Sequence, residues 1–184
     1  MFENFLIGAK IEGDFAHQIY GWQQQQKNFD SEDIHWLKPE SFHVTFIPPW
    51  FSEPKQLEIG LQKFEIGLRY WKIGPFEVNF NTIKFGPDFN KPQFIMATGP
   101  KTHDIGLFEE ILSFDVGYYV PPTGIYPYIP IASLSGTVNE DFIEGIDWHY
   151  NICKIYFMKT NGLDEKDYQV VKEFDLEHIK LGLP

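Results

Sequence analysis

Residues 36–48 constrain the fold more than any other part of this chain. They hold two short apolar runs separated by Lys-Pro-Glu-Ser at positions 38–41, a pattern that predicts two strands joined by a tight connection, that is, a hairpin. Side chains alternate between the faces of a strand, so His43 and Thr45 are expected on one face, about 7 Å apart. The intervening Val44 then points into the opposite layer.

Histidine and threonine at this spacing suit phosphate chemistry. An imidazole with its usual pKa of about 6.5 takes or gives a proton at neutral pH, and a nearby hydroxyl donates a hydrogen bond to a phosphoryl oxygen. The same two side chains also occur on ordinary polar strand faces. Spacing alone therefore leaves a structural and a catalytic interpretation of His43 and Thr45 open.

Residues 36–48 resemble the first signature of the two-histidine (2H) phosphoesterase superfamily, which includes 2'-5' RNA ligase-like proteins and RNA 2',3'-cyclic phosphodiesterases. Shared features are a leading aromatic residue (Trp36), a Pro-Glu turn and a His-hydrophobic-Thr-hydrophobic strand, which residues 43–46 match position by position. The resemblance implies an α+β, LigT-like fold, a single bilobal domain over residues 1–184 with the lobes changing near residue 74. Two mostly antiparallel sheets would flank a central cleft, with helices on the outside.

The family repeats the His-x-Thr strand in its second half, and residues 128–134 take that place here. Ser133 matches the second hydroxyl, but Ile131 stands where the second histidine belongs. The resemblance implies His43 as acid or base and Thr45 and Ser133 as phosphate donors, without a metal or other cofactor. Isoleucine transfers no proton, and the loss of one partner of an acid-base pair costs about 10²- to 10⁴-fold in rate.

Other polar residues could complete such a site. Of the remaining histidines, His149 at the start of a strand-like run is the best candidate to replace the missing one. Lys10, Lys84 and Lys154 lie on or near expected strands and could reach a phosphate, although a solvated sheet edge explains them equally well.

Four side chains are expected around the substrate. The rings of Trp36, Tyr126 and Tyr128 can stack on a base, and Ile131 is expected beside the substrate at the motif position of the second histidine. The resulting hypothesis is a 2H-type phosphoesterase for a 2',3'-cyclic phosphate, a 2'-5' linkage or a small cyclic nucleotide, impaired by Ile131. The alternative is a non-catalytic relative that binds a phosphorylated ligand, an RNA end or a protein partner.

The charge of the chain limits its partners. Its 26 acidic and 15 basic side chains give a formal net charge of -11 at pH 7. Because proteins that hold long duplexes usually carry a basic face, the expected partner is a small nucleotide or an RNA terminus with a phosphate. Without an apolar run of about 20 residues or a secretory start, the chain is expected to be cytoplasmic and not to enter a membrane. It is also expected to be a monomer. The single cysteine, Cys153, excludes an internal disulfide.

The remaining pattern predicts strands and helices in alternation. Strands are expected at residues 5–11, 76–85, 93–98, 128–134, 148–158 and 170–176. Helices are expected at residues 15–27, at 102–114 with Thr102 as the cap, at 140–144, and after Ser52 with Leu57, Leu61, Phe64 and Leu68 on the buried side.

Overall fold

A computed structural model of the chain describes residues 3–26, 32–52, 54–86, 94–112, 126–135, 143–160 and 168–181. Its strands are β1 (Glu3–Lys10), β2 (Ile34–Trp36), β3 (His43–Ser52), β4 (Phe76–Gly86), β5 (Phe94–Thr98), β6 (Tyr128–Leu134), β7 (Ile143–Ile152), β8 (Lys154–Thr160) and β9 (Tyr168–Asp175). Its helices are α1 (Gly13–Gln25), α2 (Pro54–Tyr70), α3 (His103–Glu110) and α4 (Leu176–Leu181), with a 3-10 turn at Pro39–Ser41.

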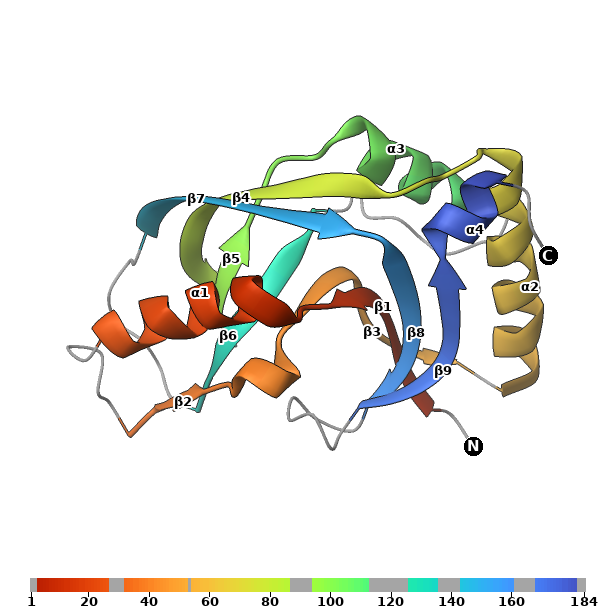
Figure 1. Ribbon diagram of the computed structural model, residues 1–184. Coiled ribbons are helices and arrows are strands. Elements are labelled where there is room, and N and C mark those ends of the chain that lie inside the picture. Colours follow the sequence, from red (N-terminus) through yellow and green to blue (C-terminus); the bar gives the residue numbers. More distant parts are fainter. Residues whose placement is uncertain are drawn as a thin grey trace.

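The strands form one curved, antiparallel, nine-stranded sheet in the order β7-β4-β5-β6-β3-β1-β8-β9, and β2 pairs with β6. One arm of the sheet contains β7, β4, β5 and β6, and the other contains β3, β1, β8 and β9 (Figure 1). Among the described residues, the arms are joined through one backbone pair, Thr45 of β3 and Tyr128 of β6. The α+β fold is therefore confirmed, and the two expected sheets are two arms of a single hydrogen-bonded sheet.

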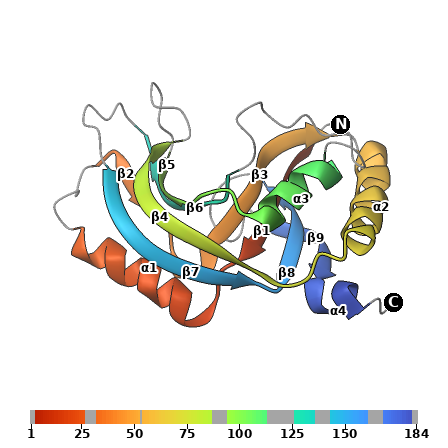
Figure 2. The same cartoon turned by 90° about the horizontal axis from the view of Figure 1, so that it is seen from above.

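The helices pack on the outside of these arms. Helix α1 lies along the arm that contains β7 and β4, whereas α2 and α4 lie beside β9 at the other end of the molecule (Figures 1 and 2). Phe15 of α1 stacks on Tyr150 of β7, with 4.9 Å between the ring centroids. Phe108 of α3 stacks on Phe46 of β3 at 5.6 Å. The Thr102 side chain caps α3 by accepting a hydrogen bond from the Ile105 N–H, as the sequence predicted.

The expected hairpin between β2 and β3 is wrong. Trp36 of β2 pairs with Ala132 of β6, and the Leu37 N–H extends this contact with a 3.0 Å hydrogen bond to the Ile131 carbonyl. The turn at Pro39–Ser41 then redirects the chain, and β3 pairs along its length with β1. Local apolar alternation predicts a strand but leaves its partner open, and here non-local partners decide the pairing.

The single strand expected at residues 148–158 is also wrong. The run is divided at Cys153 into β7, which pairs with β4, and β8, which pairs with β1. The Cys153 carbonyl accepts a 2.9 Å hydrogen bond from the Leu176 N–H, so this residue is tied to the start of α4 instead of to either ladder. The helix expected at residues 140–144 is wrong at Ile143 and Glu144, which belong to β7, and its other residues lie outside the described chain.

Within the described part of the chain, none of the helices is both long and apolar enough to cross a membrane.

The backbone of β3 leaves no room for a side chain at Gly8 of the neighbouring strand β1. Gly8 is the register partner of Thr45, and a Cβ at position 8 would lie 2.4 Å from the Val44 carbonyl oxygen. Because that atom belongs to the backbone, it cannot move aside as a flexible side chain would. A glycine is therefore required where β1 passes the His-x-Thr strand.

We expect Gly8→Ala to lower the free energy of unfolding by about 1–3 kcal/mol, because the added methyl group forces β1 and β3 apart. Gly21→Ala in α1 is the matched control, since no atom beyond its chain neighbours and the helix backbone lies within 4 Å of the new methyl group. It should raise stability by up to about 1 kcal/mol. Urea unfolding of the two variants measures both changes, and equal stabilities would contradict the close approach.

Candidate active site

The His-x-Thr strand places its two polar side chains on the same face of the sheet, as the sequence predicted. In the register of β3 and β1, Lys10 lies opposite His43 and Gly8 lies opposite Thr45. On the other side of β3, Thr45 is paired with Tyr128. Cross-strand neighbours share a face, so His43, Thr45, Lys10 and Tyr128 form one polar row where the two arms meet.

The polar row lies apart from the main hydrophobic core. His43 is 4% exposed and Thr45 is 1% exposed, so both are buried. Leu6 and Met158, which follow the same face along β1 and β8, are also buried but do not belong to the main cluster of core side chains. The site is thus a sheltered polar pair beside apolar neighbours, a setting that strengthens its electrostatic interactions.

The ring of His43 is held in one orientation. Its Nδ1–H donates a 2.9 Å hydrogen bond to the Ser41 carbonyl oxygen, which can only accept. The proton of the neutral ring is therefore on Nδ1, and the lone pair is on Nε2. Among the described residues, Nε2 has no hydrogen-bond partner. The Tyr168 ring of β9 packs against the imidazole with 4.8 Å between centroids.

Burial lowers the pKa of His43 below its usual value, and the hydrogen bond to the Ser41 carbonyl offsets this effect only in part. Burial destabilises the imidazolium ion by more free energy than the hydrogen bond to the Ser41 carbonyl stabilises it. His43 is consequently neutral at pH 7, with a lone pair available on Nε2. A neutral imidazole of this kind accepts a proton and acts as a general base.

The lowered pKa of His43 predicts a pH dependence of stability. In the unfolded chain the ring binds its proton near pH 6.5, but in the folded chain only at lower pH, so acidification between these two values favours unfolding. His43→Asn keeps a donor near the Nδ1 position but does not titrate. Urea unfolding between about pH 7.5 and pH 5 should show the wild type losing more stability on acidification than the variant. Parallel pH profiles would contradict the neutral state of His43.

Ile131 lies in the hydrophobic core and not on the face of His43 and Thr45, and its expected contact with substrate stays a prediction. Its side chain is fully buried in the main hydrophobic core. In the pairing of β5 and β6, Met96 pairs with Pro130 and Ile95 pairs with Ala132, which leaves Ile131 as the extra residue of a β-bulge. Pro130 lacks an N–H, and proline inside a sheet is tolerated at such bulges.

The backbone of this bulge is fixed by hydrogen bonds. The Ile131 carbonyl accepts one from the Leu37 N–H at 3.0 Å and one from the Gln23 side chain at 2.9 Å. The same Gln23 amide nitrogen donates to the Leu37 carbonyl at 3.0 Å. Gln23 thus ties α1 to both strands of the β2–β6 pair, and it was not singled out by any sequence motif.

Restoring the motif histidine should therefore fail. We expect Ile131→His to lower the free energy of unfolding by about 1–3 kcal/mol or more, because an imidazole without a partner would replace a core side chain. It should bring no gain in hydrolysis of a 2',3'-cyclic nucleotide. Ile131→Val, at about 0.5–1.5 kcal/mol, is the control for loss of packing alone. A stable, more active Ile131→His protein would show that position 131 reaches the polar face.

The other expected site residues are dispersed. Ser133 returns to the face of Tyr128 after the bulge, but it lies five residues further along β6, about 16 Å away, and pairs with His35. Tyr126 precedes β6 and is 47% exposed. Trp36 packs edge-on against Trp22 of α1, with 6.2 Å between centroids, and not against the His43 ring.

His149 lies among surface carboxylates and away from the His-x-Thr strand in the order of the sheet. It lies on β7, four strand positions from β3 and therefore on the order of 19 Å away along the sheet. Its two ring nitrogens contact Glu77 and Asp147 at 3.2 and 3.0 Å. Hydrogen bonds to these carboxylates, first Glu77 and then Asp147, raise the pKa of His149. This exposed histidine is part of a surface cluster of charges.

The lysine closest in register to the polar pair is Lys10. Its ammonium lies 5.5 Å from the centre of the Tyr156 ring, a cation–π arrangement on the same face as His43. Lys154 is instead engaged with Glu173 at 2.7 Å. Strand alternation in the sequence could have placed Lys10 on one face of β1 and so distinguished it from the other lysines. That β1 pairs with β3 was known only from the structure.

Within the described residues, no group of three or more His, Cys, Asp or Glu side chains is arranged to hold a metal ion.

Comparison with known proteins identifies the fold. No family model and no curated protein sequence matches the chain. Solved structures that match it over almost its whole length include TT0787 of Thermus thermophilus (13% identity, TM-score 0.67, covering 95% of this chain and 98% of that one); a phosphoesterase (12%, 0.70, 95% and 98%); and E. coli LigT complexed with NADP+ (12%, 0.65, 96% and 99%). The LigT-like fold implied by residues 36–48 is therefore confirmed.

Proposed function

We propose that this protein is a 2H phosphoesterase-like enzyme with impaired acid-base chemistry, acting on a 2',3'-cyclic phosphate, a 2'-5' linkage or a small cyclic nucleotide. The observation that carries the proposal is the state of His43: buried, neutral and oriented by the Ser41 carbonyl so that Nε2 carries the lone pair. Thr45 lies two residues away on the same face. E. coli LigT, which shares the fold, has been crystallised with 3'-AMP and with NADP+.

In the proposed hydrolysis, His43 Nε2 takes a proton from a water molecule, and the water oxygen forms a bond to phosphorus. The bond between phosphorus and one ribose oxygen breaks, and that oxygen then takes up a proton. Thr45 donates a hydrogen bond to a phosphoryl oxygen, and the Lys10 ammonium stabilises the negative charge that develops there. We assign no second acid-base side chain, so the leaving oxygen takes its proton from solvent and the reaction is slow.

The alternative is a non-catalytic protein that binds a phosphorylated ligand on the same face. The burial of Ile131 favours this binding function, because the side chain at the position of the second histidine packs in the hydrophobic core. In that case His43 would contribute a hydrogen bond and no proton transfer. The two functions differ in turnover, not in the residues that contact the phosphate.

The proposal is tested by turnover of a 2',3'-cyclic nucleotide. We expect slow hydrolysis by the wild type and a loss of about 10²- to 10⁴-fold in His43→Asn, because the variant lacks the base. His178→Asn changes an exposed histidine of α4 and is the matched control, with unchanged rate. Thermal melts establish that both variants are folded at the assay temperature. Equal turnover by wild type and His43→Asn would remove the catalytic role and leave the binding alternative.

A further inference from the structure

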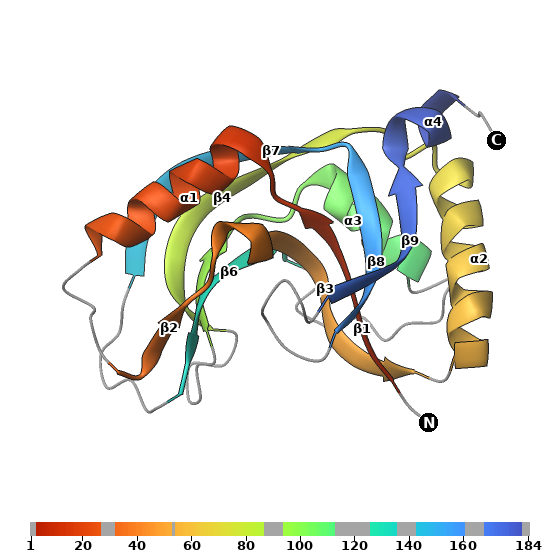
Figure 3. The ribbon, with the colours of Figure 1, turned by 60° about the horizontal axis from the view of Figure 1, so that its bottom comes forward.

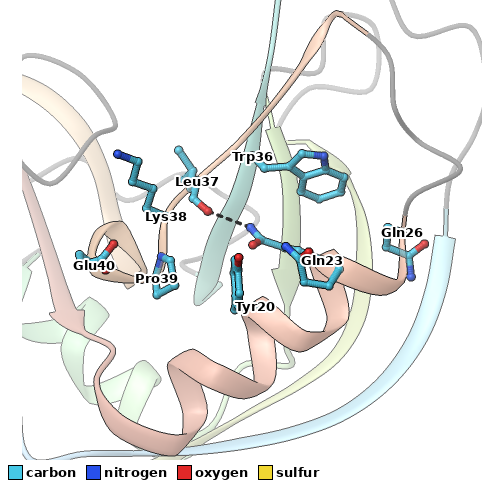
Figure 4. A pocket seen from close by; sticks show the side chains of 9 residues that line it. Tyr20, Gln23, Gln26, Trp36, Leu37, Lys38, Pro39 and Glu40 are labelled. Atoms are coloured by element: carbon cyan, nitrogen blue, oxygen red, sulfur yellow. Dashed lines mark hydrogen bonds between the residues drawn. The ribbon is translucent and has the colours of Figure 1, made fainter.

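A pocket of about 730 Å³ lies between α1 and the segment that leads from β2 to the 3-10 turn (Figure 4). Its walls include Tyr20, Gln23, Trp36, Lys38 and Pro39, but neither His43 nor Thr45. A volume of this size is typical of small-molecule sites. The pocket is therefore lined by other residues than the proposed phosphodiester site. Figure 3 shows α1 and β2, which contribute to its lining, on the side of the molecule away from β8 and β9.

Aromatic rings form two walls of this pocket. The Trp36 indole is held by its edge contact with Trp22, and the Tyr20 ring stands on the helix side next to Pro39 (Figure 4). Tyr20 is 42% exposed although it is a large ring. Rigid rings that open toward solvent provide faces on which a planar heteroaromatic group stacks.

The side-chain amide of Gln23 offers a hydrogen-bond acceptor in the wall of the pocket. Gln23 is 5% exposed, and its amide nitrogen donates to the carbonyls of Leu37 and Ile131. Because both of those partners can only accept, the amide cannot be turned around, and Oε1 is fixed as an acceptor. Oε1 accepts no hydrogen bond from the described residues. A ligand that pairs with this oxygen must present a hydrogen-bond donor, such as an N–H group.

We propose that the pocket binds the base of an adenine mononucleotide or nucleoside. The purine ring stacks on Tyr20 and Trp36, its exocyclic amine donates to Gln23 Oε1, and Lys38 at the rim receives a phosphate when one is present. A free mononucleotide fits better than a base within a strand, because a chain of net charge -11 repels the additional phosphates of a polymer. This site would act independently of His43.

The test is calorimetric titration with adenosine and with purine riboside, the same nucleoside without the amine. We expect saturable binding of adenosine and about ten-fold weaker binding of purine riboside, the effect of one hydrogen bond to a buried acceptor. Tyr20→Ala should weaken adenosine binding by about ten-fold or more, because it removes a stacking face while alanine is well tolerated in a helix. Tyr70→Ala, which removes a 77% exposed ring from α2, is the control and should bind like the wild type.

His43→Asn separates this site from the proposed active site and should bind adenosine like the wild type. Absence of saturable binding, equal affinities for the two nucleosides, or unchanged binding in Tyr20→Ala would each overturn the proposal. Adenosine binding that is lost in His43→Asn but retained in Tyr20→Ala would place the base on the face of β3. That result would overturn the separate pocket while leaving the phosphoesterase proposal intact.

Discussion

The pairing of β3 with β6 at Thr45 and Tyr128 is the constraint on which the candidate site depends. This single backbone pair joins two arms of a sheet that would otherwise have separate ladders, and it sets Tyr128 beside the His-x-Thr strand. On the other side, β1 lies so close to β3 that only glycine fits opposite Thr45. The polar row is therefore positioned by backbone contacts on both flanks.

Burial then determines the chemical state of His43. The same exclusion of water that lowers the pKa of His43 makes its lone pair available at neutral pH. It also strengthens any hydrogen bond from Thr45 to a phosphate oxygen, since competing water is removed. A contrasting case is His149, where exposed carboxylates raise the pKa and favour the charged ring. The surroundings therefore lower the pKa of His43 and raise the pKa of His149.

The departure from the two-histidine pattern is structural as well as chemical. Position 131 lies in a bulge whose carbonyl is held by Leu37 and Gln23, and its side chain fills the core. A hydrophobic residue there is consistent with that surrounding, whereas a histidine would need a polar partner. Gln23 contributes to both features, because it fixes the bulge and also supplies the acceptor in the wall of the α1 pocket.

The sequence by itself predicted most of the strands and helices, and that His43 and Thr45 share a face, because these properties follow from local periodicity. The cap at Thr102 and the buried side of α2 belong to the same class. Only the tertiary structure decided that β2 pairs with β6, that the run through Cys153 serves both arms, and that Ile131 turns into the core. Pairing partners, bulges and burial depend on contacts between residues far apart in the chain, and local alternation carries no information about them.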